Sequence, residues 1–135
     1  MNAKIPTDIK LHKQSAILKI FYTDKSSYTL SAEFLRVHSP SAEVRGHGSG
    51  QEILQTGKRE VLILQVEIVG NYAIKLTFDD GHNSGYYSWS YLEELCKHND
   101  TLWQDYLDKL QANRASRDPL PSDAQVINIQ PLSQG

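Results

Sequence analysis

Cysteine is nearly absent from this sequence, and this scarcity limits the sites that the chain can build. The one cysteine, Cys96, cannot form an internal disulfide framework or a multi-cysteine metal cluster. Long apolar runs are also missing: no segment approaches the ~20 residues of a membrane span, and residues 1–13 lack the apolar core of a signal peptide. We therefore expect a cytoplasmic protein that does not act at a membrane.

An excess of charge of either sign is missing as well. The chain has 14 Lys and Arg residues against 16 Asp and Glu residues, a formal net charge of −2. Since a basic footprint is typical of proteins that bind nucleic acid, we expect no nucleic-acid partner. The 135 residues, 39% of them hydrophobic, suit one globular domain with a small core.

Alternating apolar and polar residues predict strands in the first part of the chain. Short strands are predicted over residues 9–11, 17–22 and 28–30, and Ser31 can cap a helical turn after them. The clearest pattern is a hairpin in which two strands, within residues 61–68 and 72–79, flank Gly70-Asn71. Between the first three predicted strands and this hairpin, residues 38–51 are rich in glycine and poor in apolar side chains, which predicts a loop.

Two helices are predicted after the hairpin. Ser88 or Ser90 can start the first, and Asn99 or Asp100 can cap the second. The predicted fold class is α+β: a small, mainly antiparallel β-sheet of about five to seven strands with two C-terminal helices on or beside it. The predicted core side chains are Leu18, Ile20, Val66, Ile68, Ile74, Leu76, Phe78, Leu92, Leu95, Trp103 and Leu107.

We assign residues 1–114 to a single domain and 115–135 to a disordered tail, because the tail is rich in Pro, Ser, Asp and Gln. An alternative for the tail is that Val126, Ile127 and Ile129 dock as an edge strand or bind a partner.

Five histidines raise the question of a metal site. His38 and His47 share a loop, but no cysteine or paired histidine accompanies them, so solvated loop histidines are the simpler interpretation. His98-Asn99-Asp100 matches a fragment of a two-histidine, one-carboxylate iron site, but no histidine follows it. Cys96 falls on the apolar side of a predicted helix, which favours a core role over a nucleophilic one.

Two further groups of residues have chemical potential. Five side chains in and around the glycine-rich loop can gather as an anion-binding or partner-binding surface: Arg36, Arg45, His47, Lys58 and Arg59. The spacing of a Walker A phosphate loop is not met there. Asp79, Asp80 and His82 can form an acid/base group, although Asp80-Gly81 is also a plain turn sequence. No Ser-His-Asp arrangement is evident from the spacing.

Three segments resemble the gamma-butyrobetaine hydroxylase-like N-terminal domain, known in bacteria as a stand-alone domain of unknown function. They are Ile5-Pro6, LRVHSPSAEVRGHG (residues 35–48) and VGNYAIKLTFDDGHNSGYYSWSYL (residues 69–92). The likeness covers about residues 5 to 110. In eukaryotic relatives this domain precedes a separate oxygenase domain, for which this chain has no room. It also occurs fused to P-loop ATPases that act as iron–sulfur scaffolds, which suggests an accessory or docking role.

The resemblance implies a structural zinc site built from C-x-C-x-x-C and one later histidine. Those positions fall on Ser39, Ser41, Val44 and His82 in this sequence, so His82 is the one ligand that remains. Serine hydroxyls are poor zinc ligands at neutral pH, and valine is none. We therefore expect a degenerate metal site and no cofactor.

Three functions follow from these observations. The first is a non-catalytic interaction module for an unnamed protein partner, with a surface built from Arg36, Arg45, His47, Asp80 and His82. The second is a domain that weakly binds iron or zinc through His82, with His38 or His47 and a carboxylate such as Asp80 or Glu43; its N/O donors would favour iron. The third, ranked last, is a small enzyme that uses Asp80 and His82.

Overall fold

The computed structural model describes residues 4–46 and 50–119, and these residues form six strands and four helices. The α+β fold class is confirmed, and α3 and α4 are the two helices expected in the C-terminal half. The six strands are divided between two three-stranded antiparallel sheets. None of the helices in the described ranges is long and apolar enough to cross a membrane.

The first sheet is a meander of β1 (Asp8–His12), β2 (Ile17–Phe21) and β3 (Ser27–Ser31). Its central strand β2 alternates between fully buried and half-buried residues, as the period of two predicts. Ser31 then caps α1 (Ala32–Val37) by accepting a hydrogen bond from the amide of Phe34 at 3.0 Å, which confirms the predicted cap.

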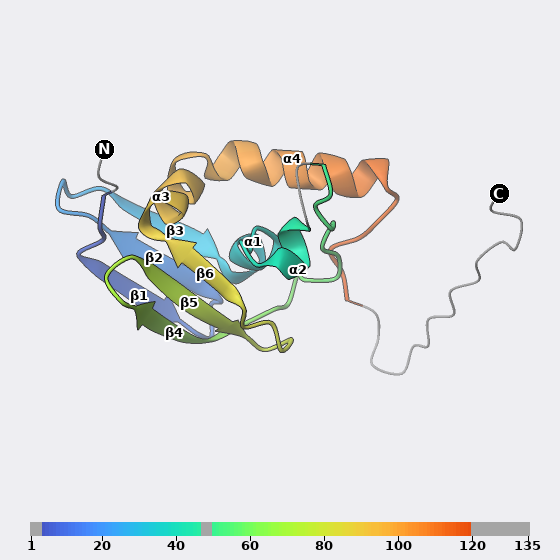
Figure 1. Ribbon diagram of the computed structural model, residues 1–135. Coiled ribbons are helices and arrows are strands. Elements are labelled where there is room, and N and C mark those ends of the chain that lie inside the picture. The colour runs from blue at the N-terminus through green and yellow to red at the C-terminus, as the bar shows by residue number, and fades with distance from the viewer. Residues whose placement is uncertain (1–3, 47–49, 120–135) are drawn as a thin grey trace, which may run out of the picture.

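The second sheet contains β4 (Ile63–Val69), β5 (Ala73–Phe78) and β6 (Gly85–Ser88). The β4–β5 hairpin turns at Gly70, whose φ of 54° lies in the left-handed region that suits glycine, so the predicted turn is confirmed. Strands β4 and β5 lie in front of β1 and β2 in Figure 1, and both sheets contribute to a single core.

All six residues of α1 are buried, and Ala32, Phe34 and Leu35 belong to this core. The short helix α2 (Ala42–Arg45) follows within residues 38–51, which the sequence had predicted to be a loop throughout. Helix α3 (Trp89–Lys97) buries Leu92, Leu95 and Cys96, which supports the core role of the cysteine. Helix α4 (Asn99–Ala112) runs across one side of the molecule, beyond α3 and α1 (Figure 1).

Several sequence predictions need correction. Ile68 is 73% exposed, because it lies on the edge strand β4, where no further strand covers it. Ser88, rather than Ser90, caps α3. Neither Asn99 nor Asp100 caps α4, because His98 takes the cap position through its backbone. The His98 carbonyl accepts a hydrogen bond from the Leu102 amide, and the His98 amide donates to the Glu94 carbonyl, so α3 and α4 follow each other directly. Val66, Trp103 and Leu107 from the predicted core are half-buried.

The segment predicted as a tail begins with residues that pack on the domain. The amides of Gly57 and Arg59 donate to the carbonyls of Ser116 and Arg117, each at 2.9 Å. The guanidinium of Arg117 also pairs with the carboxylate of Glu33 through two contacts of 2.7 and 2.8 Å. Residues 115–119 therefore belong to the folded unit, while the predictions for residues 120–135 lie outside the described ranges.

Candidate functional site

His82 lies at the centre of a buried hydrogen-bond cluster that joins the α1–α2 connection to the β5–β6 loop. Its Nε2 atom is 2.8 Å from Ser39 Oγ, and its Nδ1 atom is 3.1 Å from Glu43 Oε2. Because a carboxylate only accepts, Nδ1 carries the proton and donates to Glu43. Nε2 then accepts a hydrogen bond from the Ser39 hydroxyl, so both ring nitrogens have a protein partner.

The serines at this position are held by the local backbone. The amide of Ser41 donates to Ser39 Oγ at 3.2 Å, and Ser41 also caps α2 by accepting from the amide of Glu43. The hydroxyls of Ser41 and Ser84 are 2.7 Å apart. Gly85 packs directly against Ser39 and leaves no room for a larger residue, since a Cβ atom there would lie only 2.4 Å from Ser39 Oγ.

Burial controls the protonation of His82. The residue is only 4% exposed, and this burial lowers the pKa of the imidazole; the positive charge of Arg36 lowers it further. The carboxylate of Glu43 acts in the opposite direction, but its side chain is 70% exposed and screened by solvent. His82 is therefore a neutral hydrogen-bonding group at physiological pH.

Asp80 lies two residues before His82 in sequence but contacts its backbone amide, at 3.1 Å, rather than its ring. The Asp80 carboxylate binds Lys58 Nζ at 2.6 Å and Arg36 Nε at 2.8 Å. Burial acts to raise the pKa of Asp80, but the hydrogen bonds from Lys58, the His82 amide and Arg36 outweigh it and lower the pKa to about 2. The acid/base pair expected from Asp80 and His82 is therefore not formed.

The structure instead brings Ser39, His82 and Glu43 into the contact order of a serine-hydrolase triad, which the sequence spacing had not revealed. A nucleophilic serine must meet a substrate. Ser39 is 0% exposed and lies under Gly85, and none of the three side chains lines the groove described below. The geometry therefore suits a cross-link that fastens α2 to the β5–β6 loop.

The same cluster occupies the position of the zinc site that the family resemblance implies. Ser39 contacts His82 directly, Ser41 lies beside it, and Val44 is 5% exposed in the interior of α2. Two hydroxyls, one imidazole and an alkyl side chain do not fit zinc, which prefers thiolate, imidazole and carboxylate donors. Within the described ranges, no three His, Cys, Asp or Glu side chains converge as metal ligands.

The residues of the predicted interaction surface do not form one exposed patch, although Arg36, Asp80 and His82 lie close together. Arg36 and His82 are buried, at 7% and 4% exposure, so neither belongs to an exposed patch. Asp80 is held in its ion pairs, and Arg45 lies over the ring of Tyr91 with 5.7 Å from Cζ to the ring centroid. His47 lies outside the described ranges.

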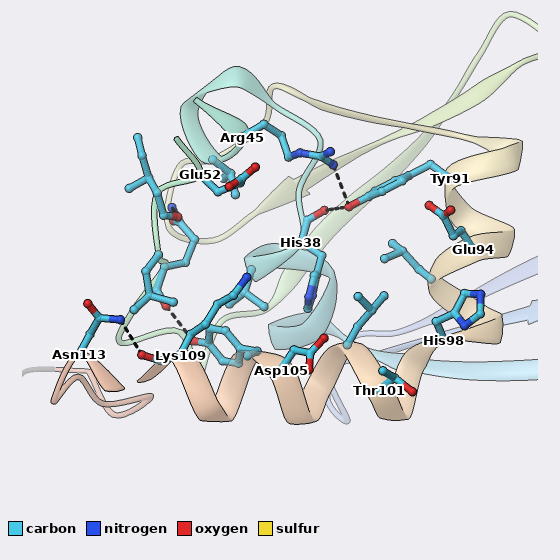
Figure 2. Close-up of a pocket in the computed structure, with 18 residues that line it drawn as sticks. His38, Arg45, Glu52, Tyr91, Glu94, His98, Thr101, Asp105, Lys109 and Asn113 are labelled. Atoms are coloured by element: carbon cyan, nitrogen blue, oxygen red, sulfur yellow. Dashed lines mark hydrogen bonds between the residues drawn. The ribbon is translucent and has the colours of Figure 1, made fainter. Parts of the chain in front are cut away.

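A groove of about 800 Å³ lies on another part of the molecule, between α4, the end of α3 and residues 52–55. Figure 2 shows His38 between Arg45 and Tyr91 on one side and Asp105 of α4 on the other. Five separate segments of the chain line this groove, from α1, α2, residues 52–55, α3 and α4, so periodicity within any one of them could not have revealed it.

His38 is a fixed part of this groove rather than a solvated loop residue. Its Nδ1 is 2.9 Å from the carbonyl of Phe34, which only accepts, so Nδ1 carries the proton and Nε2 keeps its lone pair. The Tyr91 hydroxyl donates to the His38 carbonyl at 2.6 Å. Burial lowers the pKa of His38, and the charges of Lys109 and Arg45 act in the same direction.

Fold and site together define a small α+β domain with a hydrogen-bonded histidine cluster and a separate groove. The family model described as gamma-butyrobetaine hydroxylase-like, N-terminal, matches residues 9–93. The chain belongs to this family, as the sequence resemblance predicted. Comparison with curated proteins found no match.

Solved structures support the assignment. Two proteins with solution NMR structures are 50% and 44% identical to this chain, with TM-scores of 0.78 and 0.75. The first comparison covers 94% of this chain and 100% of the other, and the second covers 95% and 96%. A crystal structure of a DUF971-family protein of unknown function from Acidithiobacillus ferrooxidans is 36% identical, with a TM-score of 0.56, over 67% of this chain and 90% of the other.

Proposed function

We propose that this protein is a non-catalytic accessory domain that binds another protein and uses the His82 cluster, in place of a structural metal, to hold its fold together. The observation that supports this most strongly is that both ring nitrogens of His82 have protein partners, Ser39 and Glu43. A side chain committed in this way stabilises a loop junction without offering an open position for a substrate.

The ion pairs near the cluster support the same role. Asp80 joins Arg36 of α1 to Lys58, which precedes β4, and its own backbone continues into the His82 loop. Ion pairs and hydrogen bonds thus link three distant segments at the place where the family resemblance implies a zinc site. The cytoplasm remains the location that we predict.

The rival function is a domain that binds iron or zinc through His82 and Glu43. The observation in favour of this function is that the exposed carboxylate of Glu43 lies 3.1 Å from the imidazole of His82, so the two side chains could act as neighbouring metal ligands. Two donors give at most a low-affinity site, because structural zinc takes four.

Metal content separates the two functions. Untagged protein is purified without chelator, and metal is quantified by inductively coupled plasma mass spectrometry for wild type and His82→Ala. The accessory-domain proposal predicts substoichiometric metal that is equal in both proteins. Near-stoichiometric zinc or iron that disappears in His82→Ala would establish the metal-binding function instead.

A further inference from the structure

We propose that the groove along α4 binds an extended segment of another protein that carries a Lys or Arg side chain next to apolar side chains. This inference rests on the proposed interaction function and names its surface and partner chemistry. The groove shares Val44 with the degenerate zinc position, but none of the hydrogen-bonding side chains Ser39, Glu43 and His82 lines it, so each proposal can fail independently of the other.

The length of the groove favours an extended chain. Its lining residues on α4 and the residue that caps it run from Thr101 to Asn113. At 1.5 Å per residue this is about 18 Å of helix, the length of roughly five residues of extended peptide. The volume of about 800 Å³ lies within the range of about 300–1,000 Å³ that is typical of ligand-binding clefts.

The groove wall formed by residues 52–55 contains backbone amides that can donate hydrogen bonds to a bound peptide. Residues 51–56 form no helix or strand, and among the described residues no hydrogen bond is donated by the amides of Leu54 and Gln55. The Tyr106 hydroxyl fixes this segment to α4 by donating to the Gln55 carbonyl at 2.8 Å. A guest chain beside Leu54 can pair with this backbone as an added strand does.

The floor of the groove is apolar and its α3 end is rich in acceptors. Val44 and Leu95 are 5% and 1% exposed, and Leu102 is half-buried beside them. Glu94 and Asp105 also line the groove, and within the described ranges neither has an ion-pair partner. An apolar floor below free carboxylates complements a segment that combines aliphatic side chains with a cation.

His38 and the two cations of the groove refine this assignment. The free Nε2 lone pair of His38 adds an acceptor to those of Glu94 and Asp105, so a ligand here must supply donors. Arg45 is occupied by the Tyr91 ring and hydroxyl. Lys109 lies one helical turn beyond Asp105 and would repel a cation there. The bound peptide should therefore be oriented with its basic side chain at the Glu94 end of the groove.

The test selects ligands without assuming their sequence. A display library of short random peptides is panned on the full-length protein, and enriched peptides are synthesised and titrated onto ¹⁵N-labelled protein. We expect enriched peptides with Lys or Arg beside apolar residues, and shifts at Leu54 and Leu102. The double variant Glu94→Lys/Asp105→Lys should weaken their binding by at least about tenfold. Asp108→Lys, which reverses one charge at an exposed position on α4 outside the groove, is the control and should leave binding unchanged.

The outcomes are distinguishable. Both variants alter exposed residues, so an unchanged amide spectrum confirms that they fold. Peptides that bind the double variant as well as wild type, or a panning that enriches none, would overturn the groove assignment. Enriched peptides that shift residues around β4 or His82 would also overturn it, while leaving the wider interaction function in place.

Discussion

Replacing His82 with alanine should destabilise the protein severely, without any metal being involved. The substitution removes the hydrogen bonds to Ser39 and Glu43. It leaves the Ser39 hydroxyl in a site of 0% exposure, which costs about 1–3 kcal/mol where no new partner is found. The lost packing against Phe78, whose ring centroid is 6.1 Å away, adds about 1–2 kcal/mol.

The expected total is about 2–5 kcal/mol, a large part of the ~5–15 kcal/mol that stabilises a typical domain. Urea denaturation of wild type and His82→Ala, with and without chelator, measures this difference at constant m-value. Glu43→Gln is the matched control: its side chain is 70% exposed, so we expect a loss below about 1 kcal/mol.

A double-mutant cycle isolates the buried contact. Ser39→Ala removes the hydroxyl that His82→Ala would strand, so the two substitutions together should cost less than their sum by about 0.5–3 kcal/mol. Additive effects would refute the claim that these two side chains stabilise each other. A wild-type protein that loses stability in chelator, down to the level of His82→Ala, would refute the metal-free account.

Three more predictions concern the same region. Burial lowers the folded-state pKa of both His82 and His38, so the unfolded chain binds protons more readily than the folded chain once the pH falls below the unfolded histidine pKa of about 6.5. The contribution of these neutral histidines to stability should therefore be complete above that pH and should decrease as the pH drops through it. Urea titrations at a series of pH values would contradict this if the free energy of unfolding stayed constant or rose as the pH fell. Gly85→Ala should destabilise by about 1–3 kcal/mol in thermal or urea denaturation, because the added Cβ lies 2.4 Å from Ser39 Oγ; an unchanged midpoint would show that the loop yields freely. Tyr87→Phe should cost about 1–2 kcal/mol, because its buried hydroxyl donates to a carbonyl of α1 at 2.5 Å; no loss of stability would mean that this bond contributes nothing.

Local features were predictable from the sequence because their causes are local. The Gly70-Asn71 turn and the Ser31 cap each depend on a few adjacent residues, and both are found in the structure. Ile68 was misplaced for the opposite reason. Its alternation marks a strand face correctly, but its exposure depends on β4 being at the edge of the sheet, which is a property of topology.

The site was only partly predictable for the same reason. Ser39 and His82 are 43 residues apart, and no spacing rule relates them; the family resemblance alone placed both at one site. Arg36 was expected at the surface because of its charge, but its side chain is buried and its charge is compensated by the ion pair with Asp80. The role of His38 depended on the Phe34 carbonyl, a backbone group that a side-chain pattern cannot reveal.

The most direct test of the central claim is the protonation and coordination state of the His82 ring. Long-range ¹H–¹⁵N correlation spectra of labelled protein report both ring nitrogens before and after addition of equimolar zinc. The account predicts a neutral ring with a protonated Nδ1 and an unprotonated Nε2, and signals that zinc does not change. A stoichiometric shift of either His82 nitrogen on adding zinc would contradict it.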